Sequence, residues 1–304
     1  SKPRVLRTPS ISTTKEHHVS VQADVNITTQ VVNTQYGEIS ISRAGAGEPL
    51  VMLHGGGPGA SALANYRDNL PAFVGNVEVV LPDQPGFGAS YIPTEDELVT
   101  KGITNITVDA LLEALDNIGI NRFALMGNSL GGAAAIAMAI AAPERVTKLI
   151  LMAPGGGWFP AGPRPTEGQK QMYLYYNGEG PTLEKMRNFV NVMVADPRQF
   201  DEAAIVKRYE SSLDPERIAF YHQYNAAFSK RRGMDPLWRD VHKIKAPTLL
   251  LWGRDDRTIT LEGASIMLAN IRDVQMHVFG NCGHWVQVEK KAEFEALVNQ
   301  FIAE

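Results

Sequence analysis

Six short apolar runs, each bounded by turn-forming residues, constrain the fold of this 304-residue chain more than any other feature. They are residues 49–53, 77–81, 123–126, 149–152, 248–252 and 274–279. Runs that are apolar at almost every position suit strands buried on both faces, as in a parallel sheet. Stretches with helical spacing of apolar residues, such as 108–118 and 294–302, separate several of the runs. The alternation predicts an α/β fold: an open, mostly parallel sheet flanked by helices, with its site beyond the carboxyl ends of the strands.

Two segments depart from this alternation. Between residues 26 and 42, two β-rich runs predict a hairpin with one exposed face. Residues 155–243 begin with a stretch rich in glycine and proline and continue with helix-like sequence, which is too long for a simple connection. We therefore expect a core domain at 26–154 and 244–304, interrupted by a helical cap at 155–243 and preceded by an N-terminal tail at 1–25.

Composition excludes several classes of protein. Apolar residues make up 44% and charged residues 20% of the chain, as in ordinary globular proteins. A net charge of −4 lacks the basic excess that binding to nucleic-acid phosphates requires, so no nucleic-acid partner is expected. The single cysteine, Cys282, cannot form a disulfide within the chain, and the first twenty residues contain no apolar signal-peptide core, so a cytoplasmic protein is expected. The long uncharged stretch 123–142 has a glycine-rich turn at its centre, so no membrane span is expected.

One motif indicates nucleophilic catalysis. The segment 127–131, GNSLG, matches the pattern G-x-S-x-G between a predicted strand and a predicted helix, where small residues allow a strained turn that raises the hydroxyl of Ser129 above the sheet. A serine needs a base to take its proton and an acid to orient that base. His284 follows the last predicted strand, and Asp255 and Asp256 follow the strand before it. The order Ser, Asp, His predicts a hydrolase triad in which either aspartate could be the acid.

A glycine-rich segment, HGGGPGA at 54–60, follows the first of the six runs. Glycines at this place let backbone N–H groups face a developing oxyanion, and the second donor is expected from Leu130, the residue after the nucleophile. A phosphate-binding loop is the alternative, but the segment lacks the Gly-Lys-Ser/Thr ending that such a loop needs. The segment therefore predicts one half of an oxyanion hole.

These motifs together resemble those of the α/β-hydrolase family over about residues 29–304, and more specifically those of the meta-cleavage product hydrolases, which hydrolyse carbon–carbon bonds in aromatic-ring degradation. The resemblance rests on HGGGPGA with Asn65, Tyr66 and Arg67 after it, on GNSLGG at 127–132, and on GRDDR at 253–257 followed by CGHW at 282–285. It implies a substrate of the 2-hydroxy-6-oxohexa-2,4-dienoate type, cut by water into 2-hydroxypenta-2,4-dienoate and a carboxylic acid. It also implies that neither a metal nor an organic cofactor is required.

The resemblance further implies roles for single residues. Ser129 matches the nucleophile, His284 the base and Asp256, rather than Asp255, the orienting acid. The residues that match the oxyanion donors are Gly56 and Leu130, and those that match the positions holding the dienoate end are Gly55, Asn65, Asn128, Arg208 and Trp285. An anionic substrate suits a guanidinium and amides, since burying a carboxylate without partners costs several kcal/mol.

Simpler interpretations stand beside these. Arg208 could lie on a solvated helix face beside Lys207, Asn128 could only brace the turn, and Trp285 could only pack. A serine esterase, lactonase or aminopeptidase of the same fold would carry the same triad, and a ligand-binding protein built on a hydrolase scaffold is the alternative from another class. Adaptable side chains in the cap leave the C6 substituent open. We expect a small anionic substrate, no membrane partner and a homo-oligomer.

Overall fold

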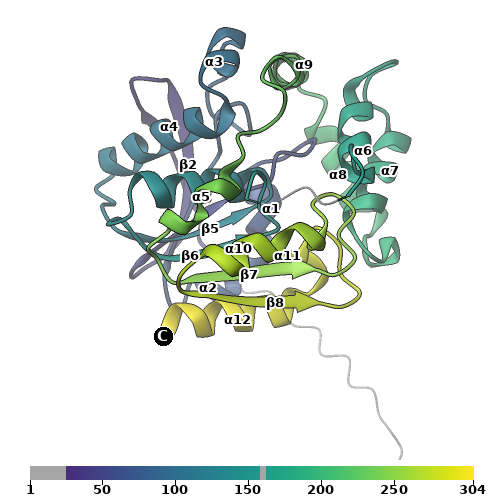
Figure 1. Ribbon diagram of the computed structural model, residues 1–304. Coiled ribbons are helices and arrows are strands. Elements are labelled where there is room, and N and C mark those ends of the chain that lie inside the picture. Colours follow the sequence, from purple (N-terminus) through teal and green to yellow (C-terminus); the bar gives the residue numbers. More distant parts are fainter. Residues whose placement is uncertain (1–24, 158–161) are drawn as a thin grey trace, which may run out of the picture.

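The computed structural model describes residues 25–157 and 162–304 and contains an eight-stranded sheet in the order β1-β2-β4-β3-β5-β6-β7-β8 (Figure 1). Both neighbours of β2 pair with it in antiparallel fashion, and all other neighbours are parallel. The strands are β1 (Thr28–Asn33), β2 (Glu38–Gly45), β3 (Pro49–Leu53), β4 (Glu78–Pro82), β5 (Phe123–Asn128), β6 (Val146–Met152), β7 (Thr248–Gly253) and β8 (Val274–Phe279). The predicted mostly parallel sheet is confirmed, whereas the predicted tail lies outside the described residues up to residue 24.

Helices cover both faces of this sheet. The core helices are α1 (Ala62–Tyr66), α2 (Leu70–Phe73), α3 (Glu95–Thr100), α4 (Ile103–Asn117), α5 (Leu130–Ala141), α10 (Ser265–Asn270), α11 (Val286–Glu289) and α12 (Lys291–Ala303). Apolar residues of α4, α5 and α10 pack on one face together with Val51 and Leu53 of β3, while those of α2, α11 and α12 pack on the other with Leu50 and Met52. In the described part of the chain, no helix combines the length and the apolar character needed to cross a bilayer.

The N-terminal hairpin differs from its prediction in one respect. β1 has an exposed face, but β2 is buried on both sides because it lies between β1 and β4. Its small polar residues keep hydrogen-bond partners: the N–H of Ser40 donates to the hydroxyl of Ser90 at 3.0 Å, and the hydroxyls of Ser42 and Thr29 lie 2.8 Å apart. Polar alternation in β2 therefore reflects buried hydrogen bonds and not contact with solvent.

A group of helices between β6 and β7 forms the cap: α6 (Glu167–Tyr176), α7 (Leu183–Met193), α8 (Glu202–Ser211) and α9 (Pro215–Lys230). Each begins where a Thr or Asp side chain accepts a hydrogen bond from a backbone N–H of the first turn, which satisfies a donor that has no partner within the helix. α6, α7 and α8 lie past the carboxyl ends of β7 and β8, and α9 lies beside α3 (Figure 1). One apolar cluster joins the cap to the core, and it includes Leu130 and Trp285 of the predicted site.

Candidate active site

The backbone at Ser129 has the strained turn that the G-x-S-x-G pattern predicts. Ser129 lies between β5 and α5 with φ 54° and ψ −114°, a region that residues with a side chain rarely adopt. Its N–H donates to the carbonyl of Met152 at 3.0 Å, and its own carbonyl accepts from the N–H of Gly155 at 2.8 Å. The flanking glycines are required sterically: a Cβ on Gly127 would lie 2.3 Å from the carbonyl oxygen of Gly131, and one on Gly131 would meet the backbone of β3 at the same distance.

A buried aspartate–histidine pair lies beyond the ends of β7 and β8. The Nδ1 atom of His284 is 2.7 Å from Oδ2 of Asp256, and the two side chains are 3% and 0% exposed. The other carboxylate oxygen of Asp256 accepts the backbone N–H groups of Thr258 at 2.7 Å and Ile259 at 3.0 Å. These bonds fix the carboxylate, so that it can orient the imidazole and stabilise its protonated form.

The alternative acid, Asp255, has different surroundings. Its side chain is 39% exposed and forms an ion pair with Arg254 at 3.1 Å. This hydrogen bond and the positive charge of Arg254 lower the pKa of the Asp255 carboxyl. Asp256 is therefore the aspartate that contacts His284, while Asp255 belongs to the surface.

Within the described part of the chain, no hydrogen bond joins the side chains of Ser129 and His284. The two residues follow β5 and β8, whose carboxyl ends lie at the same edge of the sheet. Catalytic hydrogen bonds are often long before substrate binds and shorten in the complex.

The glycine-rich loop lies directly against the turn at Ser129. A Cβ on Gly55 would be 2.9 Å from Oδ1 of Asn128 and 3.5 Å from Cβ of Ser129. A Cβ on Gly56 would be 2.7 Å from Cδ2 of Leu130. A side chain at either position would have to displace Asn128 or Leu130, so the glycines let the loop pack against the turn and make the expected oxyanion donors, Gly56 and Leu130, neighbours.

Three of the residues expected to hold the dienoate end carry buried polar atoms without a partner. They are Nδ2 of Asn65, Oδ1 of Asn128 and Nε of Arg208. Asn128 also donates from Nδ2 to the carbonyl of Met152 over a long 3.4 Å, so it braces the turn as well. Buried polar atoms are nearly always hydrogen bonded in folded proteins, so these three indicate a place where a polar ligand supplies the missing partners.

Arg208 does not lie on a solvated helix face. Its guanidinium carbon is 4.8 Å from the ring centre of Trp285 and 5.5 Å from that of Phe189. Burial lowers its pKa to about 10, and among the described residues no carboxylate forms an ion pair with it. Its neighbour Lys207 is exposed. Trp285 also packs on Phe189 and Phe200, so its packing interpretation and its place in the site are compatible.

One residue of the site was missed by the sequence analysis. The half-buried carboxylate of Glu289 accepts the N–H groups of Gly283, beside His284, and of Ala195, just past the end of the cap helix α7, both at 2.7 Å. Burial raises the pKa of this carboxyl. The N–H of His284 in turn donates to the carbonyl of Met193 at 2.7 Å. These bonds connect the loop that carries His284 to the cap. The only feature of the sequence that could have indicated the role of Glu289 is its place five positions after His284.

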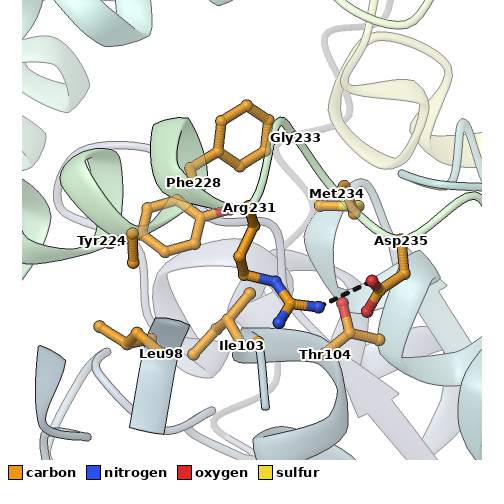
Figure 2. Close-up of a pocket in the computed structure, with 11 residues that line it drawn as sticks. Leu98, Ile103, Thr104, Tyr224, Phe228, Arg231, Gly233, Met234 and Asp235 are labelled. Atoms are coloured by element: carbon orange, nitrogen blue, oxygen red, sulfur yellow. Dashed lines mark hydrogen bonds and ion pairs between the residues drawn. The ribbon is translucent and has the colours of Figure 1, made fainter. Parts of the chain in front are cut away.

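A small cavity lies between the core and the far end of α9 (Figure 2). It measures about 20 Å³, and its walls include Leu98, Ile103, Tyr224, Phe228 and Met234. Figure 2 shows that an ion pair between Arg231 and Asp235, 2.8 Å long, lies across it. None of the predicted site residues lines it within the described part of the chain, so it belongs to the junction of cap and core.

A second cavity of about 210 Å³ lies beside the glycine-rich loop, with Gly57, Tyr176, Arg217 and Tyr221 in its walls. Arg217 donates from Nη2 to the carbonyl of Ser90 at 3.0 Å, while its Nε and Nη1 are buried without a partner. None of the three catalytic side chains of the described site lines this cavity, so we place no reacting group there.

A serine in a strained strand-to-helix turn, a buried aspartate–histidine pair and a glycine-rich loop beside the serine together define a serine hydrolase of the α/β class. The sequence profile described as alpha/beta hydrolase fold matches residues 48–291.

Individual relatives narrow the class. The 2-hydroxy-6-oxo-6-phenylhexa-2,4-dienoate hydrolase of Comamonas testosteroni is 40% identical over 271 residues, which cover 87% of this chain and 91% of that protein. A 2-hydroxy-6-oxononadienedioate/2-hydroxy-6-oxononatrienedioate hydrolase of Pseudomonas sp. is 37% identical, covering 88% and 92%. The solved structure of the phenylhexadienoate hydrolase from Rhodococcus sp. strain RHA1 has a TM-score of 0.83 at 26% identity, covering 92% and 100%. The chain belongs to the meta-cleavage product hydrolases, a family of α/β hydrolases.

Proposed function

We propose that the protein uses water to cleave the C5–C6 bond of a 2-hydroxy-6-oxohexa-2,4-dienoate, giving 2-hydroxypenta-2,4-dienoate and a carboxylic acid. One observation supports this substrate class beyond family membership: Arg208 is a half-buried cation whose Nε atom is buried without a hydrogen-bond partner, and no acidic group pairs with it among the described residues. Such a group is costly unless an anion joins it, and the carboxylate of a dienoate supplies that anion. The free amide atoms of Asn65 and Asn128 can complete its hydrogen bonds.

The first proposed step moves a proton. His284 mediates protonation of the bound dienolate at C5, which gives a keto form with an ordinary ketone at C6. General acid–base catalysis of this kind typically contributes about 10²- to 10⁴-fold in rate. The keto form matters because, when the C5–C6 bond breaks, its electron pair can remain on C5 as part of a stabilised dienolate.

The second step is acyl transfer to Ser129. Its hydroxyl attacks C6 while His284 takes the proton, and the N–H groups of Gly56 and Leu130 stabilise the oxyanion. The C5–C6 bond then breaks, and the departing dienolate is protonated to 2-hydroxypenta-2,4-dienoate. Water, activated by His284, hydrolyses the acyl ester on Ser129 and releases the carboxylic acid. These steps use side chains, backbone and water alone.

A serine esterase, lactonase or aminopeptidase remains the alternative, because the triad is common to all of them. None of those reactions requires an unpaired guanidinium beside the glycine-rich loop, which is why Arg208 favours the dienoate. From the sequence we also propose the domain limits given above and assembly into a cytoplasmic homo-oligomer.

The deciding experiment mixes the purified protein with a yellow 6-phenyl or 6-alkyl dienoate and follows bleaching while both products are identified. We expect one 2-hydroxypenta-2,4-dienoate and one carboxylic acid for each dienoate consumed. Turnover of simple esters without any bleaching of the dienoates would instead assign the site to an esterase.

Arg208→Ala should weaken binding of the anionic end of the substrate. Losing a hydrogen-bonded charge partner for a buried carboxylate costs about 2–3 kcal/mol, so kcat/KM should fall roughly 30- to 150-fold, mainly through KM. The midpoint of thermal unfolding without ligand should stay the same or rise, because a buried unpaired charge is removed. Steady-state kinetics and a thermal melt measure the two effects.

The matched control is Lys207→Ala, which removes the exposed cation next to Arg208 in the same helix. It should leave KM within about twofold of the original value, since exposed charges contribute little. If Arg208→Ala also left KM and kcat unchanged, Arg208 would have no role in binding substrate.

A further inference from the structure

Both peptide groups that flank Gly56 are held by buried side chains outside the predicted triad. The Nδ1 atom of His54 is 2.8 Å from the carbonyl oxygen of Gly55, on one side of Gly56. The hydroxyl of Tyr221 donates to the carbonyl oxygen of Gly56 itself at 2.9 Å. His54 is fully buried, and Tyr221 is 6% exposed.

The direction of the first bond follows from the other ring nitrogen of His54. The backbone N–H of Gln84 donates to Nε2 at 3.0 Å, so Nε2 must be the unprotonated nitrogen. Burial lowers the pKa of His54, which keeps the ring neutral. The proton therefore sits on Nδ1 and is donated to the carbonyl of Gly55.

Holding the Gly55 carbonyl sets the direction of the Gly56 N–H. The C=O and N–H of one trans peptide lie in a plane and point in opposite directions, so fixing one orients the other. Gly56 needs this help because glycine has the freest backbone of all residues, yet a Cβ there would lie 2.7 Å from Leu130. An oxyanion donor is effective only when its direction is set before the reaction begins.

The second bond comes from the cap. Tyr221 lies in α9, and its ring packs against Tyr176 and Tyr224 with centre distances of 4.6 and 6.3 Å. Burial raises the pKa of the Tyr221 hydroxyl, which keeps it protonated and able to donate. The hydrogen bond to Gly56 thus connects a helix of the cap to the loop beside Ser129.

We propose that Tyr221 is a positioning residue for the reaction. Its hydroxyl and the ring of His54 hold the backbone around Gly56, so that the Gly56 N–H points at the oxyanion that forms when Ser129 attacks C6. This inference rests on the acyl transfer at Ser129 proposed above. Tyr221 would touch neither the dienoate nor the reacting atoms. It would make the contact between α9 and the glycine-rich loop a condition for fast acyl transfer.

Tyr221→Phe removes a single oxygen, so the chain should still fold, which a thermal melt checks. Because a misdirected oxyanion donor loses much of its effect, kcat should fall on the order of tenfold to a hundredfold. KM and the affinity for the product 2-hydroxypenta-2,4-dienoate should stay within about twofold, since that product does not occupy the oxyanion hole. Affinity for a boronic acid that forms a tetrahedral adduct on Ser129 should fall in parallel with kcat.

Tyr224→Phe is the matched control, since Tyr224 lies one turn later in α9 and, within the described part of the chain, makes no hydrogen bond to the glycine-rich loop. It should leave kcat unchanged. The same comparison with a simple ester keeps the test independent of the dienoate, because any acyl transfer at Ser129 uses the oxyanion hole. The inference is overturned if Tyr221→Phe keeps its kcat, or if product affinity and kcat fall equally.

Discussion

Ser129→Ala should abolish turnover of the dienoate while the protein continues to bind it. Removing the nucleophile of a serine hydrolase triad lowers kcat on the order of 10⁴-fold or more, and the oxyanion hole supplies only the small activity that remains. Alanine adopts φ 54° no less readily than serine, and the hydrogen bonds at this position use the backbone, so the turn should persist. Single-turnover absorbance and a dienoate titration measure turnover and binding separately.

Ser211→Ala gives a control for this substitution, because Ser211 is an exposed serine of the cap at the end of α8. Its turnover should equal that of the unsubstituted protein. Near-normal cleavage by Ser129→Ala would mean that water attacks C6 directly and that Ser129 is not the nucleophile. Loss of dienoate binding together with cleavage would show instead that the turn had collapsed.

The fold was predictable because its strongest signal is local. A strand buried on both faces must be apolar almost throughout, and the limits predicted for β3 agree with the structure. The limits of β8 also agree, but β8 is an edge strand with largely exposed residues and not a strand buried on both faces. β6 begins three residues before its predicted start, since Lys148 interrupts the apolar run. Its ammonium group donates to the carbonyls of Phe301 and Ile302 at the end of α12, where a cation is favoured. That contact is made by a segment more than 150 residues away, so no local pattern reveals it.

The candidate site was predictable only where a motif fixes the backbone. Glycines around Ser129 are required by close contacts between main chains, and Gly55 and Gly56 lie against the side chains of Asn128 and Leu130, so both sets leave a mark in the sequence. The environment of Arg208, by contrast, depends on how the cap packs against Trp285, and helical periodicity left its solvated and buried interpretations open. Tyr221 acts through one hydrogen bond to the backbone of a distant loop and Glu289 through two backbone hydrogen bonds, one of them to the distant Ala195, and such bonds need no recognisable pattern.

Asp256→Asn should reduce kcat about 10⁴-fold with little change in dienoate affinity. An asparagine can still accept the N–H groups of Thr258 and Ile259 through its oxygen, so the loop should keep its shape. Its amide NH₂ would then face Nδ1 of His284, where the carboxylate now accepts a hydrogen bond at 2.7 Å. The ring would have to move its proton to Nε2, the nitrogen that must take the proton from Ser129.

Asp255→Asn is the matched control, because the order of the motifs left both Asp255 and Asp256 as candidates for the acid. It makes the same change in the neighbouring residue, but it breaks only an exposed ion pair with Arg254, which contributes little to stability. Its kcat should stay within about twofold. If the two variants lost equal activity, the charge of this loop rather than the tautomer of His284 would control the reaction. If only Asp255→Asn were inactive, Asp255 and not Asp256 would be the acid that orients His284. The acid is the carboxylate that contacts the base, and order along the chain does not decide which one that is.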